Sequence, residues 1–257
     1  MQYTIDESDL SRQRLLAHIL NRATERHLAE LAPTRSGRWL DIGSGVGETT
    51  RMLTRFMAAD GECVGLEQDP ALVEVARRQD WAARRVVFQQ GDATHLPFED
   101  RSFDFVFTRY LLIHLPNPLE AIREMLRVTK PGGIVFAQEP DFGFSCCYPP
   151  NRSYERATGI FTALFPDAQI GRKLVHLFRE AGAKSPQARA DIGIEYDSVD
   201  VKRIYRMTYE AVGAALIGSG RMSETEFQDL LNDFISVEAD PSIVVIGNPV
   251  VAVWTSV

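Results

Sequence analysis

The chain has 257 residues, of which 45% are hydrophobic and 25% are charged, so it has enough apolar side chains for the core of an ordinary globular protein. Its formal net charge of −7 argues against a nucleic-acid partner, because a phosphate backbone is bound mainly by clustered lysines and arginines. The longest apolar stretch, IVVIGNPVVAVW, is too short to cross a bilayer and is interrupted by Gly247, Asn248 and Pro249. We therefore expect neither a nucleic-acid partner nor a membrane association.

The cysteines and the first ten residues indicate in which cellular compartment the protein is expected. The three cysteines, Cys63, Cys146 and Cys147, have neither the spacing of a disulfide framework nor that of a zinc site. The first ten residues, MQYTIDESDL, are acidic where a signal peptide would be basic and then apolar. We expect free thiols in a reducing compartment, and hence a cytoplasmic protein.

The first half of the chain alternates between helices and short apolar strands. An amphipathic helix is predicted over residues 9–31. Asp69-Pro70 and Asn117-Pro118 each supply an N-cap side chain and a proline suited to the first helical position. The KPGG sequence, Lys130 to Gly133, predicts a turn before the fifth strand. The candidate strands are Arg38–Ile42, Glu62–Leu66, Val86–Gln89, Phe103–Phe107 and Ile134–Gln138. Such repeated strand–helix–strand units predict an α/β fold with a mainly parallel sheet and helices on both faces.

After Pro140 the pattern becomes mainly helical. Helical segments are predicted over 150–182, with a stop at Gly182, and over 198–236, where a capping box begins at Ser223. A strand over 186–196 and a bent or paired strand at the end complete the pattern. We interpret the chain as one domain, made of an N-terminal helical cap (1–35), a ligand-binding core (36–145), a helical lid with late strand elements (146–240) and a C-terminal strand (241–257).

The sequence WLDIGSGVGETT places three glycines between the first strand and the next helix. Gly43, Gly45 and Gly47 suit a backbone that turns tightly or lies against a ligand. A dinucleotide fingerprint requires a small residue where this chain has Glu48. A carboxylate in the first helical turn would repel a pyrophosphate from the positive end of the helix dipole. The loop therefore favours a nucleotide-like ligand without phosphates.

Three acids lie where neighbouring strands end. Asp41 ends the first strand and can orient the loop amides or accept a hydrogen bond from an ammonium group. Glu67 follows the second strand, where an acid accepts hydrogen bonds from both ribose hydroxyls in dinucleotide folds. Asp92 follows the third strand and can accept from an exocyclic adenine amine. Each acid alone is a weak signal, but their order and spacing together indicate an adenosyl ligand.

With these residues the chain resembles the class I S-adenosylmethionine-dependent methyltransferases, and within them the ubiquinone/menaquinone-type (type 11) branch that acts on small molecules. The resemblance covers about residues 38–140 and continues more weakly in GRKLVHLFREAGA. It implies a Rossmann-like, doubly wound, mostly parallel sheet of seven strands with helices on both faces and a helical lid insertion. It also implies S-adenosyl-L-methionine as the cofactor. The motifs that carry it are LDIGSGVGETT, VGLEQDP, QQGDATHLPFEDRSFDFVFTRYLLIHLPNP and EMLRVTKPGGIVFAQEPD.

The resemblance further implies roles for individual residues. The glycine loop lies under the methionyl part of the cofactor, and Arg109 begins the loop after the fourth strand, where the backbone approaches the same part. Tyr3 and His18 are candidates to close over the cofactor, or else form a helix cap and a half-buried surface side chain. The residues implied in cofactor binding are Tyr3, Asp41, Gly43, Gly45, Gly47, Glu67 (ribose), Gln68 (beside the adenine), Asp92 and Ala93 (adenine edge), and Arg109.

Methyl transfer requires a general base only where the acceptor atom must lose a proton. His114 is the candidate base by residue type, or else it braces its loop. Glu139 is a second catalytic candidate, and Asp141 lies beside it; either acid can orient the acceptor, bind a cation or cap the turn at Pro140. The RYL sequence from Arg109 supplies no acids after the fourth strand, so we predict no metal ion.

The sequence leaves three functions open. The first is methylation of a small organic molecule at oxygen, nitrogen or carbon, because the lid is rich in aromatic residues that suit an apolar pocket. The second is methylation of RNA or protein, which requires a basic strip beside the pocket. The third is a non-catalytic, cofactor-binding partner subunit. We expect a monomer or a homodimer. The candidates for the basic strip are Arg152, Arg156, Arg172 and Lys173.

Overall fold

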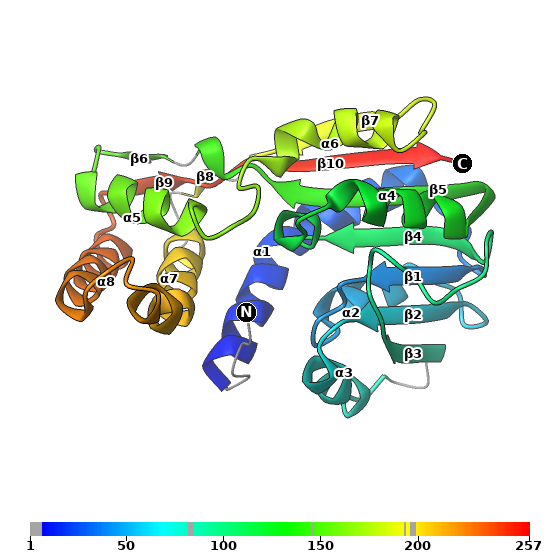
Figure 1. The fold of residues 1–257 in the computed structure, drawn as a ribbon, viewed down its shortest axis with the longest axis horizontal. Helices are drawn as coiled ribbons and strands as arrows, with labels where there is room; N and C mark the ends of the chain where they lie inside the picture. The colour runs from blue at the N-terminus through cyan, green and yellow to red at the C-terminus, as the bar shows by residue number, and fades with distance from the viewer. Residues whose placement is uncertain (1–6, 82–84, 145, 193, 196–198) are drawn as a thin grey trace.

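The main sheet has seven strands in the order β3-β2-β1-β4-β5-β10-β7 (Figure 1). The computed structural model describes residues 7–81, 85–144, 146–192, 194–195 and 199–257. The first five strands pair in parallel, whereas β10 runs antiparallel to both β5 and β7. The predicted Rossmann-like fold class is confirmed. The strands are β1 (Arg38–Ile42), β2 (Glu62–Glu67), β3 (Arg85–Gln90), β4 (Phe103–Arg109), β5 (Thr129–Pro140), β7 (Gln187–Asp191) and β10 (Val250–Ser256).

Helices cover both faces of this sheet. On one face, α1 (Glu7–Leu31) and α2 (Glu48–Thr54) bury residues such as Leu28 and Leu53 against Phe105 of β4. On the other face lie α4 (Pro118–Val128) and α6 (Ile170–Glu180), whose apolar residues join a second core. Helix α3 (Pro70–Arg77) packs beside β2 and β3.

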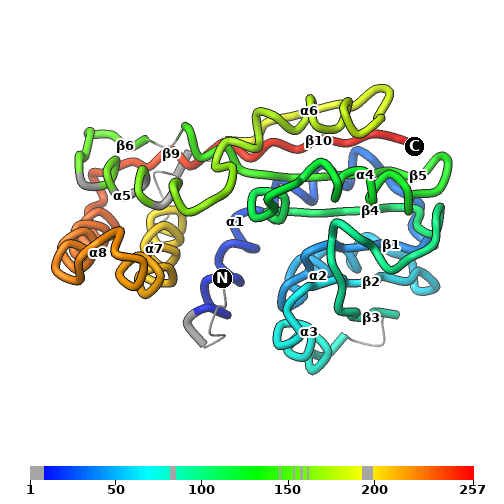
Figure 2. The backbone as a smooth tube through the Cα atoms, viewed as in Figure 1, coloured from blue at the N-terminus to red at the C-terminus, as the bar shows by residue number. Residues whose placement is uncertain are grey.

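The lid is a separate layer built on a small antiparallel sheet of β6 (Cys146–Tyr148), β9 (Val244–Ile246) and β8 (Ile194–Glu195). Its helices are α5 (Arg152–Thr162), α7 (Asp200–Gly218) and α8 (Glu224–Ala239). They enclose their own apolar core, which includes Tyr154, Leu216 and Phe234. Figure 2 shows α1 between the lid helices and the end of the main sheet that carries α2 and α3. Helix α1 packs directly on α7.

One helix of the predicted lid belongs to the main sheet instead. Helix α6 lies on β5 and β10, beside α4. Its buried residues Ile170, Leu174 and Phe178 recur every fourth position and form one apolar stripe, which packs into the core of the sheet. The helix ends where predicted, since it stops at Glu180 and Gly182 has φ 108°.

Most of the local start signals act as predicted. The side chain of Asp69 accepts a hydrogen bond from the Ala71 amide at the start of α3, and that of Ser223 accepts from the Glu226 amide at the start of α8. Asn117 occupies the N-cap of α4 but makes no side-chain cap bond there, so that expectation is wrong.

The KPGG sequence is also not a free turn. It forms the first part of β5, and the Gly132 amide donates to the carbonyl of Val257 at the end of β10. The ladder between β4 and β5 shifts register between Phe103 and Phe105, which accommodates the left-handed Gly132.

Candidate cofactor and acceptor site

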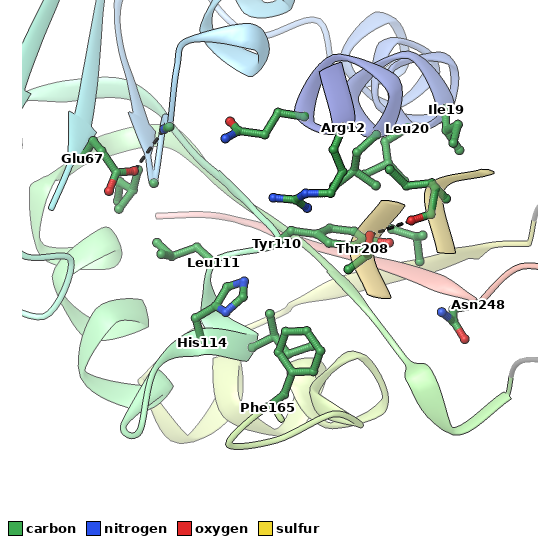
Figure 3. A pocket seen from close by; sticks show the side chains of 18 of the residues that line it. Arg12, Ile19, Leu20, Glu67, Tyr110, Leu111, His114, Phe165, Thr208 and Asn248 are labelled. Atoms are coloured by element: carbon green, nitrogen blue, oxygen red, sulfur yellow. Dashed lines mark hydrogen bonds between the residues drawn. The ribbon is translucent and has the colours of Figure 1, made fainter. Parts of the chain in front are cut away.

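A cavity of about 1750 Å³ lies at the carboxyl ends of the main strands, beneath α1 and the lid. This is the place where open α/β sheets bind ligands. Figure 3 shows Glu67 at one end of the cavity and Asn248 at the other. Between them lie Tyr110 and His114. One continuous space therefore joins the loops of the parallel strands to the lid.

The glycine loop has the backbone that its sequence predicts. Gly43, Gly45 and Gly47 have φ values of 74°, 53° and 92°, all in the left-handed region. Gly43 and Gly45 line the cavity, whereas Gly47 is the N-cap residue of α2 and does not. A Cβ atom at Gly47 would lie 2.8 Å from the ring of Trp81. Gly47 thus shapes the loop from behind.

We expect Gly47→Ala to lower the free energy of unfolding by about 1–3 kcal/mol, because it combines a left-handed backbone with a clash against Trp81. The matched control is Gly132→Ala, since Gly132 has φ 80° but a Cβ atom added there would have no heavy atom within 4 Å. Urea unfolding of both variants separates the cost of the left-handed backbone, which both share, from the cost of the clash with Trp81, which only Gly47→Ala has. Equal losses in the two variants would show that Trp81 does not constrain the loop.

Asp41 and Arg109 also lie behind the loop rather than in the cavity wall. The Asp41 carboxylate accepts a hydrogen bond of 2.6 Å from Thr50 of α2, and its burial raises its pKa to about 6. The Arg109 guanidinium donates to Asn21 and Thr24 of α1 and to Thr49 of α2. Burial lowers its pKa to about 10. Both side chains fasten α1 and α2 to the strand ends.

Glu67 lines the cavity and binds the backbone around it. Its Oε2 accepts a hydrogen bond from the Gly45 amide at 3.0 Å. Its Oε1 accepts from the amides of Gln68 and Asp69 at 2.8 and 3.0 Å. A carboxylate offers about four acceptor positions, so these three amides leave about one for a ligand.

The remaining predicted adenosyl residues gather beside Glu67. Gln68, Asp92 and Ala93 all line the cavity. Asp92 uses Oδ1 to accept from the amide and hydroxyl of Thr94, and these bonds lower its pKa. The hydrogen bonds of the described residues leave its Oδ2 available for a ligand donor.

Two residues were predicted to close over this region, and the structure describes one of them. Tyr3 is outside the described residues. His18 is exposed on α1 and does not line the cavity. The cavity face of α1 instead carries Arg12 and Gln13, and both donate hydrogen bonds to Asp9.

The two catalytic candidates occupy opposite sides of one loop. His114 lines the cavity, and its ring lies 5.3 Å from that of Phe165, centroid to centroid. Burial and the charge of Arg12 lower its pKa, so the imidazole is neutral near pH 7. Glu139 is fully buried behind the loop and is not part of the cavity wall. Glu139, predicted as a second catalytic candidate, therefore does not reach the cavity, and that prediction is corrected.

Glu139 holds the loop that carries His114. Its carboxyl oxygens accept from the amides of Leu111, Leu112 and Ile113 at 2.9, 2.8 and 3.3 Å. Burial raises its pKa to about 8. The neighbouring acid, Asp141, is paired with both nitrogens of the Arg172 guanidinium that face it, at 2.5 and 2.8 Å. Both acids thus contact protein groups.

Sequence reasoning missed Tyr110, which lies in the middle of the cavity wall (Figure 3). Its φ of 57° is rare for a residue with a bulky side chain, and such strained residues concentrate at functional sites. Burial raises the pKa of its phenol far above the usual value, so the hydroxyl stays protonated. The RYLL sequence contains no glycine or asparagine that signals a left-handed turn.

Comparison with known proteins identifies the core. Residues 40–137 match the methyltransferase domain of the type 11 family. An uncharacterised methyltransferase of Schizosaccharomyces pombe is 35% identical over 129 residues, which cover 47% of this chain and 45% of that protein. A demethylmenaquinone methyltransferase of Staphylococcus aureus is 34% identical over 115 residues, or 45% of this chain and 48% of that protein. The matched stretch thus spans about half the length of these relatives.

Solved structures extend the likeness of the fold to most of the chain. The [4+2]-cyclase SpnF has a TM-score of 0.59 at 20% identity, covering 92% of this chain and 82% of that one. The YcgJ protein of Bacillus subtilis has a TM-score of 0.58 at 19% identity, covering 90% and 97%. In the described part of the chain, no helix has the length and apolarity to span a membrane. Residues 40–137, which carry the glycine loop and the strand-end acids, are thus similar to the methyltransferase domain of the type 11 family of class I S-adenosylmethionine-dependent methyltransferases.

Proposed function

We propose that the protein transfers the methyl group of S-adenosylmethionine to a small organic molecule. The observation that carries the proposal is the continuous cavity, which joins an adenosyl-type loop cluster to an apolar space under the lid. S-adenosylmethionine, when bound, supplies the activated methyl group. The chain's own task is to hold the acceptor in line with that group, which is worth about 7–11 kcal/mol of the barrier in well-oriented reactions.

The cavity residues fit the cofactor. Gly43 and Gly45 present backbone without side chains, and a Cβ atom at Gly45 would come within 3.4 Å of Gln13 on α1. Glu67 accepts from the ribose hydroxyls, and Gln68, Asp92 and Ala93 surround the adenine. About one hydrogen-bond acceptor position of the Glu67 carboxylate is open. To bind both ribose hydroxyls, the carboxylate must therefore lose its hydrogen bond to one of the three amides. We assign this change to Gly45, the only one of the three donors that belongs to the glycine loop.

We assign to His114 the role of the general base, which takes a proton from the substrate that receives the methyl group. It lies in the middle of the cavity and is neutral near pH 7, the state that a general base requires. Glu139 positions this loop through the three backbone amides and does not reach the cavity. The protonated Tyr110 phenol, which also faces the cavity, can donate a hydrogen bond to the acceptor.

The charges near the lid disfavour an RNA or protein substrate. Three of the four candidate cations of a basic strip are neutralised by acids. Arg156 pairs with Glu226, and Arg172 pairs with Asp141. Lys173 pairs with Asp167. An anionic polymer would have to displace these partners, so a small acceptor is the better-supported substrate.

Calorimetric titration with S-adenosylmethionine tests the cofactor half of the proposal. We expect the wild type to bind and Glu67→Gln to bind at least about 10-fold more weakly, because it loses a charged acceptor for the ribose. Glu74→Gln is the matched control: Glu74 lies on α3 and its side chain pairs with Arg78 outside the cavity. Absence of binding by the wild type at millimolar cofactor would refute the proposal.

A further inference from the structure

The lid end of the cavity differs in chemistry from the cofactor end. Charged side chains such as Arg12, Glu67 and Asp92 line the cofactor end. The described residues that α7 and the link between β9 and β10 contribute to the wall are all uncharged. The charged residue Asp191 of β7, which pairs with Val250 at the start of β10, also lines the cavity, and its carboxylate is paired with Arg26 and His27. The uncharged residues of the wall from α7 and the link include Val201, Ile204, Tyr205, Thr208, Val212 and Asn248.

Asn248 has a buried polar atom in this wall that lacks a hydrogen-bond partner among the described residues. Its Nδ2 donates a hydrogen bond of 2.6 Å to the Tyr205 hydroxyl. Its Oδ1 is buried and has no hydrogen-bond partner among the described residues. The oxygen and nitrogen of an amide are assigned from their surroundings, and in the opposite orientation Nδ2 would be the unpartnered atom. In either orientation one amide atom remains for a ligand. Buried polar groups are nearly always paired, so this atom calls for an explanation.

The backbone holds Asn248 at a fixed place relative to the reaction centre. It lies in the short link from β9 of the lid sheet to β10 of the main sheet. The carbonyl of the next residue, Pro249, accepts from the Asp141 amide at 2.8 Å. Val250 then pairs with Pro140 at the end of β5. Figure 3 shows Asn248 at the far end of the cavity from Glu67, beyond Tyr110 and Thr208. A group bound to Asn248 is thus held at a set distance from the cofactor loops.

We propose that Asn248 is the specificity-determining residue for the acceptor, and that the acceptor is an uncharged, mainly apolar molecule with a hydroxyl group remote from the methylated atom. A hydroxyl can donate to Oδ1 or accept from Nδ2, so it satisfies the amide in either orientation. The uncharged wall disfavours carboxylates and ammonium groups, which lose their hydration there without gaining a partner. The cavity of about 1750 Å³ exceeds the roughly 300–1,000 Å³ of a typical ligand pocket, so the cofactor and such an acceptor both fit. This inference rests on the proposed function.

A structural role for the same residue makes a different prediction. If Asn248 serves only to pin Tyr205 to the β9–β10 link, its bond to the Tyr205 hydroxyl is all that matters. Replacement would then change stability without changing which molecules bind. Ligand selectivity therefore distinguishes recognition from bracing.

Matched naphthalene probes measure that selectivity. We would titrate the full chain with 2-naphthol, 2-methylnaphthalene and 2-naphthoate, with and without saturating S-adenosylhomocysteine. We expect 2-naphthol to bind about 10-fold more tightly than the other two, and Asn248→Leu to lose this margin while its affinity for 2-methylnaphthalene is unchanged. Asn232→Leu is the matched control, since Asn232 bonds to Gln228 on the surface of α8. Asn248→Ser is the second variant in case the leucine variant does not fold. We expect the same loss of preference for 2-naphthol, because the shorter serine side chain does not reach the position of the asparagine amide.

Failure of 2-naphthol to bind, equal binding of the three probes, or an unchanged margin in the Asn248 variants would overturn the inference. If S-adenosylhomocysteine binds but the Asn248 variants keep the preference for 2-naphthol, only the role of Asn248 is refuted. An absence of S-adenosylhomocysteine binding refutes the proposed function, and the titrations without it still decide the role of Asn248.

Discussion

Replacement of His114 by glutamine should lower kcat by about 10²–10⁴-fold, the contribution of a positioned general base. The affinity for S-adenosylmethionine should remain within a factor of about two, because His114 faces the middle of the cavity and the cofactor residues gather around Glu67. The measurement is single-turnover kinetics with a hydroxylated acceptor, together with calorimetric binding of the cofactor. His176→Gln is the matched control, since His176 is exposed on α6 and lies outside the cavity.

The same residue determines the expected pH dependence. A base acts in its deprotonated form, and burial together with the Arg12 charge lowers the pKa of His114 below the usual 6.5. The rate should therefore be constant between pH 7 and 8 and fall as the pH drops through a pKa below 6.5. A His114→Gln variant with wild-type kcat, or a wild-type rate that does not fall in acid, would contradict this role and leave His114 as a brace of its loop.

Replacement of Glu139 by alanine should lower the free energy of unfolding by about 3 kcal/mol or more. It leaves the buried amides of Leu112 and Ile113, and the partly buried amide of Leu111, without their acceptor. The loop that carries His114 should loosen as well, so kcat should fall while cofactor affinity changes little. Urea unfolding at pH 6 gives the stability, and Glu139→Gln, which keeps an acceptor oxygen, should lie between the wild type and the alanine variant.

The burial of Glu139 also makes the stability depend on pH in a set direction. Its folded pKa of about 8 lies above the ordinary value of 4.5. The protonated form is therefore favoured by folding, and its contribution is complete below pH 4.5 and is lost as the pH rises through about 8. In that window the wild type should lose about 1.4 kcal/mol per pH unit relative to Glu139→Gln. A stability difference between the two proteins that is the same at pH 6 and pH 9 would contradict the assignment.

The parallel strands and the glycine loop were predictable because their signals are local. β1 begins and ends where the apolar run predicts, and Gly43, Gly45 and Gly47 adopt the left-handed backbone that their spacing requires. The predicted adenosyl residues also converge, because the carboxyl ends of parallel strands meet at one edge of a sheet.

The orientation of residues at the ends of β4 and β5 was not predictable in the same way. Both faces of a central parallel strand are buried, so the alternation of side chains does not indicate which face an acid or a cation takes. Glu139 and Arg109 accordingly turn into the protein and bind backbone and helix groups. The left-handed backbone of Tyr110 arises from the turn that leads into the short 3₁₀ helix η1 (Leu112–His114) and has no sequence signal.

The assignment of α6 shows a further limit of sequence patterns. Its apolar stripe is readable from the sequence, and it correctly predicts an amphipathic helix. The stripe does not say which apolar surface it covers. That choice depends on β10, which enters the sheet beside β5 from the far end of the chain and creates the surface on which α6 packs.

Transfer of an isotopically labelled methyl group tests the central claim most directly. Purified protein would be incubated with methyl-labelled S-adenosylmethionine and a defined library of neutral phenols and alcohols, with the corresponding carboxylates and amines as comparison. We predict label in at least one neutral hydroxylated compound, enzyme-dependent production of S-adenosylhomocysteine, and loss of both in Glu67→Gln at low cofactor concentration. Binding of the cofactor without transfer to any neutral compound, or transfer confined to the charged compounds, would contradict the account.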